Sequence, residues 1–290
     1  MEYLLHIFVL VGIYTVLAVS LDLLAGQTGL LSIAHAAFYG LGAYAAALLA
    51  GRLGAPFLVG TLIGMLVAIL VSFLVSLPSV RLHDDYLAIA TFGFQMIIFS
   101  IFNNWMGLTH GPLGISGIPH PSIFGWPIRS SAGFVALAAL LAGFAYLVVW
   151  RIATSPFGRV LRAIREDQVL TQAMGKNTLW FKVAAFAISA ALAASAGSLY
   201  AHYITYIDPT SFTVIESILV ISMVIIGGAG SRWGPLLGAA ILVTLPEALR
   251  FLGLPSSVAA SLRQIIYGTV LLIMMMVRPR GLVGKYGFGR

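Results

Sequence analysis

Nine apolar stretches dominate this chain, and most are long enough to cross a lipid bilayer as an α-helix, which takes about 20 residues. Hydrophobic residues make up 60% of the 290 residues and charged residues only 9%, which is more apolar surface than a water-soluble domain can bury. The sequence therefore predicts an all-α membrane protein, a polytopic bundle of about eight to nine transmembrane helices that forms one domain over residues 1–290. The predicted spans cover residues 3–25, 30–50, 56–77, 86–102, 131–150, 179–201, 213–229, 234–252 and 261–277.

Most of the 16 lysines and arginines fall in segments that this arrangement places on one side of the membrane. They concentrate in a loop over residues 151–178 and in a basic tail over residues 278–290. Because loops rich in Lys and Arg stay in the cytoplasm, we expect this loop and the C-terminus inside the cell and the N-terminus outside. Topology thus explains the net charge of +7, which does not indicate nucleic-acid binding.

The residue types needed for most catalytic centres are missing or scattered. The chain has no cysteine, and its six histidines include no pair at the i,i+4 spacing of a helical metal site. Neither a P-loop lysine motif nor a Gly-x-Ser-x-Gly elbow occurs. We therefore expect no metal site and no enzymatic activity, and any ATP hydrolysis would take place on another protein.

Glycines cluster around the second predicted span and again before the eighth. Small residues let membrane helices approach closely, and glycine also permits a broken helix that lines a cavity, so both interpretations stay open. Each cluster places a Gly-x-x-Gly or Gly-x-Gly turn before a small-residue helix. An internal repeat would explain this similarity, and so would chance between two glycine-rich spans. The glycines concerned are Gly29, Gly40, Gly42, Gly227, Gly228 and Gly230.

Carboxylates are rare inside the predicted spans, where an ionisable group is costly and commonly functional. Asp22 and Glu247 lie near predicted span ends, where water is within reach. Glu216 lies in the outer part of the seventh predicted span and is the strongest candidate for a residue on a transport path. The shortage of buried carboxylates argues against a carrier driven by ion coupling.

The loop over residues 151–178 predicts a short amphipathic helix over 156–167 and a second piece that ends near Gly175. Ser155 and Pro156 suit the N-cap and the first helical position. At 100° per residue, apolar and charged side chains separate onto two sides. The apolar side comprises Phe157, Val160, Leu161 and Ile164, and the other side carries Arg159, Arg162, Arg165 and Glu166.

Two interpretations of this helix stay open. It can lie in the membrane interface on anionic lipid. Alternatively it is a coupling helix, whose apolar ridge enters a groove on a cytosolic partner while its arginines orient the contact.

Several long motifs resemble those of a known family. They are GLLSIAHAAFYGLGAYAAALLA near the N-terminus, SPFGRVLRAIREDQVLTQAMGKN in the basic loop and GGAGSRWGPLLGAAILVTLPEALR before the eighth span. With further motifs in register they extend over about residues 20–284. The chain is identified as a member of the LivM-type permeases of ATP-binding-cassette (ABC) importers for branched-chain amino acids.

The resemblance implies a permease subunit that imports branched-chain amino acids across the cytoplasmic membrane of a bacterium or archaeon. It also implies a second, related permease, two cytosolic ATPase subunits that bind ATP and Mg²⁺, and an extracytoplasmic substrate-binding protein. This chain would bind no cofactor itself. The family's cytosolic loop contacts the ATPase, so this role is expected of Arg159, Arg162, Arg165, Glu166 and Asp167.

The outer loop after the fourth predicted span is expected to receive the binding protein or to line the path. Its candidate residues are Asn103, Asn104, Trp105, Thr109 and His110. Two departures lie nearby, because the family often has Gly-Glu where this chain has Gln95-Met96, and Thr-Gly-Gly where it has Thr109-His110-Gly111. These departures leave open urea, a short amide or another small polar solute as substrate. A stand-alone channel or secondary carrier is the alternative from another class.

Overall fold

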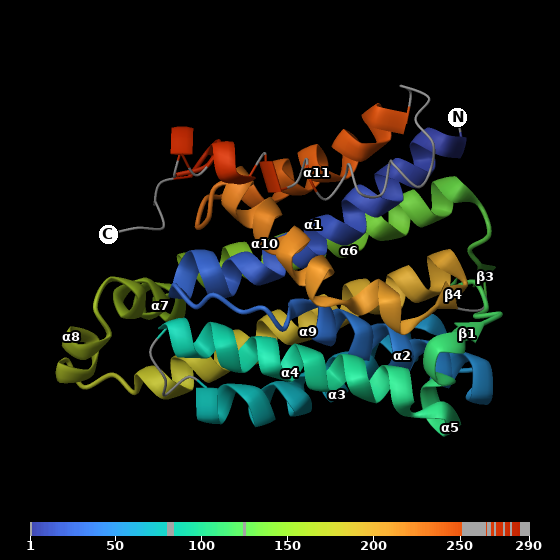
Figure 1. Ribbon diagram of the computed structural model, residues 1–290, viewed down its shortest axis with the longest axis horizontal. Coiled ribbons are helices and arrows are strands. Elements are labelled where there is room, and N and C mark those ends of the chain that lie inside the picture. The colour runs from blue at the N-terminus through green and yellow to red at the C-terminus, as the bar shows by residue number, and fades with distance from the viewer. Residues whose placement is uncertain are drawn as a thin grey trace.

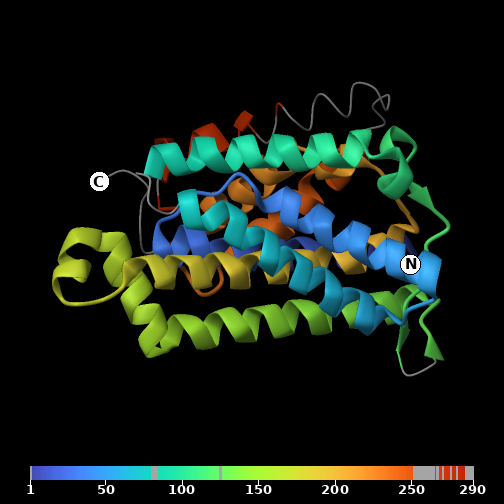
Figure 2. The ribbon, with the colours of Figure 1, turned by 90° about the horizontal axis from the view of Figure 1, so that it is seen from below.

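The computed structural model describes residues 2–79, 84–123 and 126–250 and, nearer the C-terminus, residues 265, 268–269, 271–274, 276–278 and 280–284. The long helices run roughly along the long axis of the molecule (Figure 1; Figure 2). Among the described residues, six helices are long and apolar enough to cross a membrane. They are α1 (Glu2–Thr28), α2 (His35–Leu53), α3 (Phe57–Ser79), α4 (Asp84–Asn104), α6 (Ser131–Thr154) and α9 (Thr178–Ile204).

Two shorter apolar helices, α10 (Val214–Gly227) and α11 (Gly234–Arg250), also belong to the bundle. The 14 residues of α10 reach about 21 Å at 1.5 Å per residue and so cross only part of a hydrocarbon core about 30 Å thick. The predicted all-α polytopic class is confirmed, and the first eight predicted spans each correspond to one of these helices. The ninth, residues 261–277, and the tail lie largely outside the described residues.

The two ends of the bundle differ. At one end α7 (Pro156–Glu166) and α8 (Gln168–Ala173) project beyond the long helices, and we call this the α7–α8 end (left in Figure 1 and Figure 2). The opposite end, the strand end, carries the short helices α5 (Met106–Thr109) and η1 (Gly111–Leu113) and two pairs of short strands. Strand β1 (Ile115–Ser116) pairs antiparallel with β4 (Tyr206–Ile207), and β2 (Ser122–Ile123) pairs antiparallel with β3 (Trp126–Pro127).

Helix α9 is largely buried and packs against α1, α2 and α3. A Cβ atom added to Gly197 of α9 would lie 1.9 Å from the carbonyl oxygen of Tyr39, and one added to Gly42 of α2 would lie 2.0 Å from that of Ala194. There is no room for either atom, so these glycines allow backbone contact between α2 and α9. This contact supports close packing as the role of Gly42.

The second predicted span is helical only in part. Helix α1 ends at Thr28, residues 29–34 are non-helical, and α2 begins at His35. The imidazole of His35 lies 2.8 Å from the hydroxyl of Ser20, a residue about 12 Å before the end of α1. The start of α2 therefore lies inside the bundle, and residues 29–34 form a non-helical connection between α1 and α2. The discontinuous helix that lines a substrate path stays a prediction.

Candidate functional site

Helix α7 begins as its sequence predicts. The Ser155 hydroxyl accepts a hydrogen bond from the N of Gly158 at 3.3 Å, and Pro156 is the first helical residue. At the other end Asp167 caps α8, because its Oδ1 accepts from the N of Leu170 at 2.9 Å. Asp167 thus shapes the junction between α7 and α8, and the predicted helix over residues 156–167 is confirmed to within a residue.

The apolar ridge of α7 is covered by this chain itself. Leu161 and Ile164 are buried, and the Phe157 ring packs against that of Phe181 with centroids 5.0 Å apart. The expectation that this ridge enters a partner's groove is therefore wrong for Leu161 and Ile164, which belong to the interior of the bundle, whereas Phe157 and Val160 are half-buried.

Two of the predicted coupling arginines face the end of α1. Nη1 of Arg165 donates to the carbonyl oxygen of Gly26. Nη1 of Arg162 donates to Oε1 of Gln27 at 3.2 Å and to the carbonyl oxygen of Ala153 at 2.7 Å. The last carbonyls of a helix carry partial negative charge, so guanidinium groups suit this position. Helix α7 is therefore tied to the ends of both α1 and α6.

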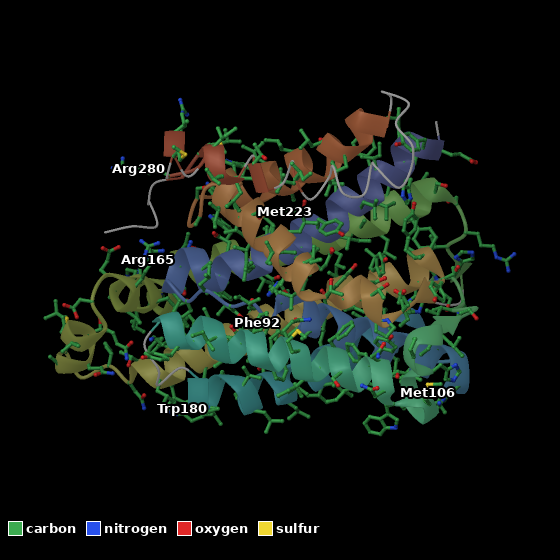
Figure 3. All side chains as sticks on the ribbon, viewed as in Figure 1. Phe92, Met106, Arg165, Trp180, Met223 and Arg280 are labelled. Carbon is green, nitrogen blue, oxygen red and sulfur yellow. The ribbon has the colours of Figure 1, made fainter. Side chains whose placement is uncertain are left out.

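The two glycine clusters meet beside Arg165, whose side chain is labelled at the α7–α8 end in Figure 3. The N of Gly230 donates to Oδ1 of Asp22 at 2.7 Å. A Cβ atom on Gly26 would lie 2.3 Å from the N of Gly230, and one on Gly29 would lie 2.7 Å from Cγ of Arg165. The glycines thus leave space for Arg165 and for the turn after α10 to reach α1.

The first part of the predicted basic tail packs on the same turn. The N of Leu282 donates to the carbonyl oxygen of Ile226 at 2.9 Å, and the N of Val283 donates to that of Gly227 at 3.1 Å. Gly228 has φ +109°, a conformation that other residues rarely adopt. These bonds satisfy carbonyls at the end of α10, so the tail closes the α7–α8 end of that helix.

The surface that α7 and α8 leave free differs from the predicted one. Arg159 and Glu166 are exposed, whereas the largest exposed apolar side chains here lie on α8 and just after it: Val169 is 75%, Leu170 60% and Met174 73% exposed. Sequence reasoning missed them because the amphipathic pattern of α7 stops at Asp167. Three exposed apolar side chains at a projecting tip are a candidate docking surface.

Gln95, the residue at the first departure from the family pattern, joins three helical elements inside the bundle. Its Oε1 accepts from the N of Ala37 at 2.7 Å, and its Nε2 donates to the carbonyl oxygen of Phe212 at 2.8 Å. Phe212 ends η2 (Pro209–Phe212), just before α10. The neighbouring N of Ala36 donates to Oγ of Ser217 on α10 at 2.9 Å. Side chains from α4 and α10 therefore accept from N–H groups at the buried start of α2, where the N of Ala37 also donates to the carbonyl oxygen of Ala34 at 3.1 Å.

The candidate residues of the outer loop lie at the strand end and differ in exposure. Asn104, Trp105 and His110 are exposed, and Asn103 is half-buried. Thr109 is buried, with its hydroxyl 2.7 Å from the carbonyl oxygen of Phe102, so it supports the loop from inside. Glu216, the candidate from the seventh predicted span, lies in the first turn of α10 and accepts a hydrogen bond from the hydroxyl of Tyr14 at 2.5 Å.

Comparison with known proteins decides the family. The family model described as "Branched-chain amino acid transport system / permease component" matches residues 3–275. This chain belongs to that permease family. It is therefore an integral membrane protein, in agreement with its apolar helices.

Curated relatives of the permease agree with this assignment. The high-affinity branched-chain amino acid transport system permease protein LivM of Escherichia coli is 34% identical over 93% of this chain and 68% of the relative. A probable LivM permease of Methanocaldococcus jannaschii is 29% identical over 71% of this chain and 62% of the relative. The permease protein LivH of Escherichia coli is 25% identical over 94% of this chain and 91% of the relative. No solved structure matches the chain.

Proposed function

We propose that this chain is the permease subunit of an ATP-driven importer of branched-chain amino acids in the cytoplasmic membrane of a bacterium or archaeon. It pairs with a second, related permease. Two cytosolic ATPase subunits bind ATP and Mg²⁺, and an extracytoplasmic binding protein delivers the amino acid to the strand end. The names of the LivM and LivH relatives support this substrate and do not favour urea or short amides.

The observation that carries the proposal is the α7–α8 end, where a projecting apolar tip is joined to a helix tied by arginines to α1. In the proposed orientation this end lies in the cytoplasm. Val169, Leu170 and Met174 enter a groove on the ATPase, because exposed apolar side chains that gather at a projecting surface mark a site of protein–protein contact. Arg159 and Glu166 lie at its polar rim.

Movement then passes from the ATPase into the membrane through packed elements. When the ATPases close on ATP, α8 and α7 move together. Arg162 and Arg165 carry this movement to the end of α1, and residues 29–34 connect that end to the buried start of α2. Because α4 and α10 both bind the start of α2, a shift there changes the packing of three helices at once, which suits alternating access.

Reconstitution tests this function. We expect proteoliposomes that hold this chain, its partner permease and both ATPases to take up radiolabelled leucine only when ATP and the binding protein are present. Proteoliposomes with ATPase subunits that cannot hydrolyse ATP are the control. Uptake of leucine by this chain alone, without ATP, would instead establish a channel or a secondary carrier.

A further inference from the structure

A cavity of about 500 Å³ opens at the α7–α8 end, between α1, α6, α7 and the turn before α11. This volume lies in the range of sites for small molecules. Its walls are apolar at Val19, Val149 and Pro235 and carry charged groups at Asp22, Arg162 and Arg232. The coupling route described above uses Arg162 but does not use the cavity.

The negative group in the wall is Asp22. Its side chain is 3% exposed, and its hydrogen bonds come from the N of Gly230 and the side chain of Gln27. Both are neutral groups, and Arg165 acts on the carboxylate electrostatically. A nearly buried carboxylate is costly unless a cation binds it, so Asp22 is suited to receive an ammonium group.

The positive groups are two guanidiniums with N–H groups to spare. Arg162 uses Nη1 for Gln27 and Ala153, and among the described residues no partner is found for its Nε and Nη2. Arg232 uses Nε for the Tyr146 hydroxyl at 3.1 Å and lies over the Trp150 ring, 4.9 Å from its centroid. Guanidinium groups with free N–H edges bind carboxylates in a fork geometry.

We propose that this cavity binds a zwitterion, a free amino acid with an apolar side chain, with its ammonium group on Asp22 and its carboxylate on Arg162 and Arg232. The apolar wall receives the side chain. A ligand that carried only negative charge would leave Asp22 without a cation, whereas a zwitterion matches all three charged groups of the wall. The inference rests on the proposed function, because the amino acid is then the imported product that accumulates on this side.

Binding there affects the coupling helix directly. A carboxylate on Nε and Nη2 of Arg162 pulls the guanidinium toward the cavity and so weakens the bonds of its Nη1 to Gln27 and Ala153, which tie α7 to α1 and α6. The accumulated amino acid therefore loosens α7 and slows ATP hydrolysis by the assembled importer.

Inside-out proteoliposomes of the full complex test this, with the binding protein and leucine enclosed and ATP added outside. We expect external leucine to inhibit ATP hydrolysis severalfold. The analogues 3-methylbutylamine and 4-methylpentanoate each carry one of the two charges and should be at least tenfold less potent.

Variants of the cavity wall test the same site. Asp22→Asn and Arg232→Gln should each raise the inhibitory leucine concentration about tenfold. Arg151→Gln removes an exposed charge on α6 outside the cavity and should not change this concentration.

Three results would overturn the site. The first is equal inhibition in all variants, and the second is normal uptake with no inhibition by external leucine. The third is inhibition only in membranes free of ethanolamine phospholipid, whose zwitterionic headgroup would then be the occupant. Should the wild-type complex fail to import leucine, the proposed function fails, and equilibrium dialysis of the complex with radiolabelled leucine still decides whether the cavity binds it. Arg232 is exposed, so its variant remains informative if Asp22→Asn does not fold.

Discussion

Arg165 on α7 donates a hydrogen bond from Nη1 to the carbonyl oxygen of Gly26, near the end of α1. The two residues are 139 positions apart in sequence. Gly29 leaves space for the aliphatic part of the Arg165 side chain, and Gly230 leaves space for its guanidinium. This contact joins the segment that projects from the bundle to α1, the helix that leads into the non-helical residues 29–34 before α2.

Loss of this contact should uncouple ATP hydrolysis from transport. Arg165→Gln removes the charged group that binds the carbonyl oxygen of Gly26. A hydrogen bond to a charged group contributes about 1.5–3 kcal/mol. We expect leucine uptake by the assembled complex to fall about tenfold or more while ATP hydrolysis falls much less. Arg151→Gln, which removes an exposed charge from α6, is the control. Equal loss of both activities, or of neither, would contradict this role for Arg165.

The tip of α8 should hold the ATPase. Leu170→Ser removes a 60% exposed apolar side chain and should weaken ATPase association by about tenfold or more, because truncating a central contact costs about 1–2 kcal/mol or more. Leu113→Ser removes a 75% exposed leucine at the strand end and should leave association unchanged. Pull-down of the ATPase at increasing concentrations measures both variants, and equal affinities would exclude α8 as the docking surface.

The contact between α2 and α9 should tolerate no added atom. Gly197→Ala places a Cβ atom 1.9 Å from the carbonyl oxygen of Tyr39, and such overpacking costs about 1–3 kcal/mol or more. We expect a lower unfolding temperature for the purified protein in detergent. Gly143→Ala on α6 meets no atom within 4 Å and should be neutral or slightly stabilising. A similar unfolding temperature for both variants would mean that the two helices are not in backbone contact.

The amide of Gln95 should be needed for the start of α2. Gln95→Leu keeps a similar volume but leaves the carbonyl oxygen of Phe212 without this partner, at about 1–3 kcal/mol. The N of Ala37 loses its bond to Gln95 and keeps only the one to the carbonyl oxygen of Ala34 at 3.1 Å. Thermal unfolding and leucine uptake should both decline. The neighbouring Met96→Leu, at a 45% exposed position, is the matched control and should behave as wild type.

The absence of cysteine from the chain makes the proposed orientation directly testable. Ser116→Cys on β1 should react with a membrane-impermeant maleimide added to intact cells, because the strand end faces outward. Ala173→Cys at the end of α8 should react only after the membrane is permeabilised. Both positions are exposed, so the reverse pattern of labelling would show that the orientation is inverted.

The sequence by itself determined the membrane class, the positions of eight helices and the start of α7. Hydropathy over about 20 residues and a Ser-Pro cap are local signals, and they remain valid wherever the segment lies. The sequence also showed that the glycine clusters and the basic loop differ from the rest of the chain. These are statements about neighbours along the chain.

Only the tertiary structure decided what those features contact. Helical projection places Arg162 and Arg165 on the same charged side as Arg159, but the end of α1 lies against that side and binds two of the three. The same holds for the glycines around residues 29 and 230, which touch although they are far apart in sequence, and for Gln95, whose partners belong to α2 and η2. Hydrogen bonds and close contacts depend on which distant segments come together, and local residue patterns do not specify those pairings.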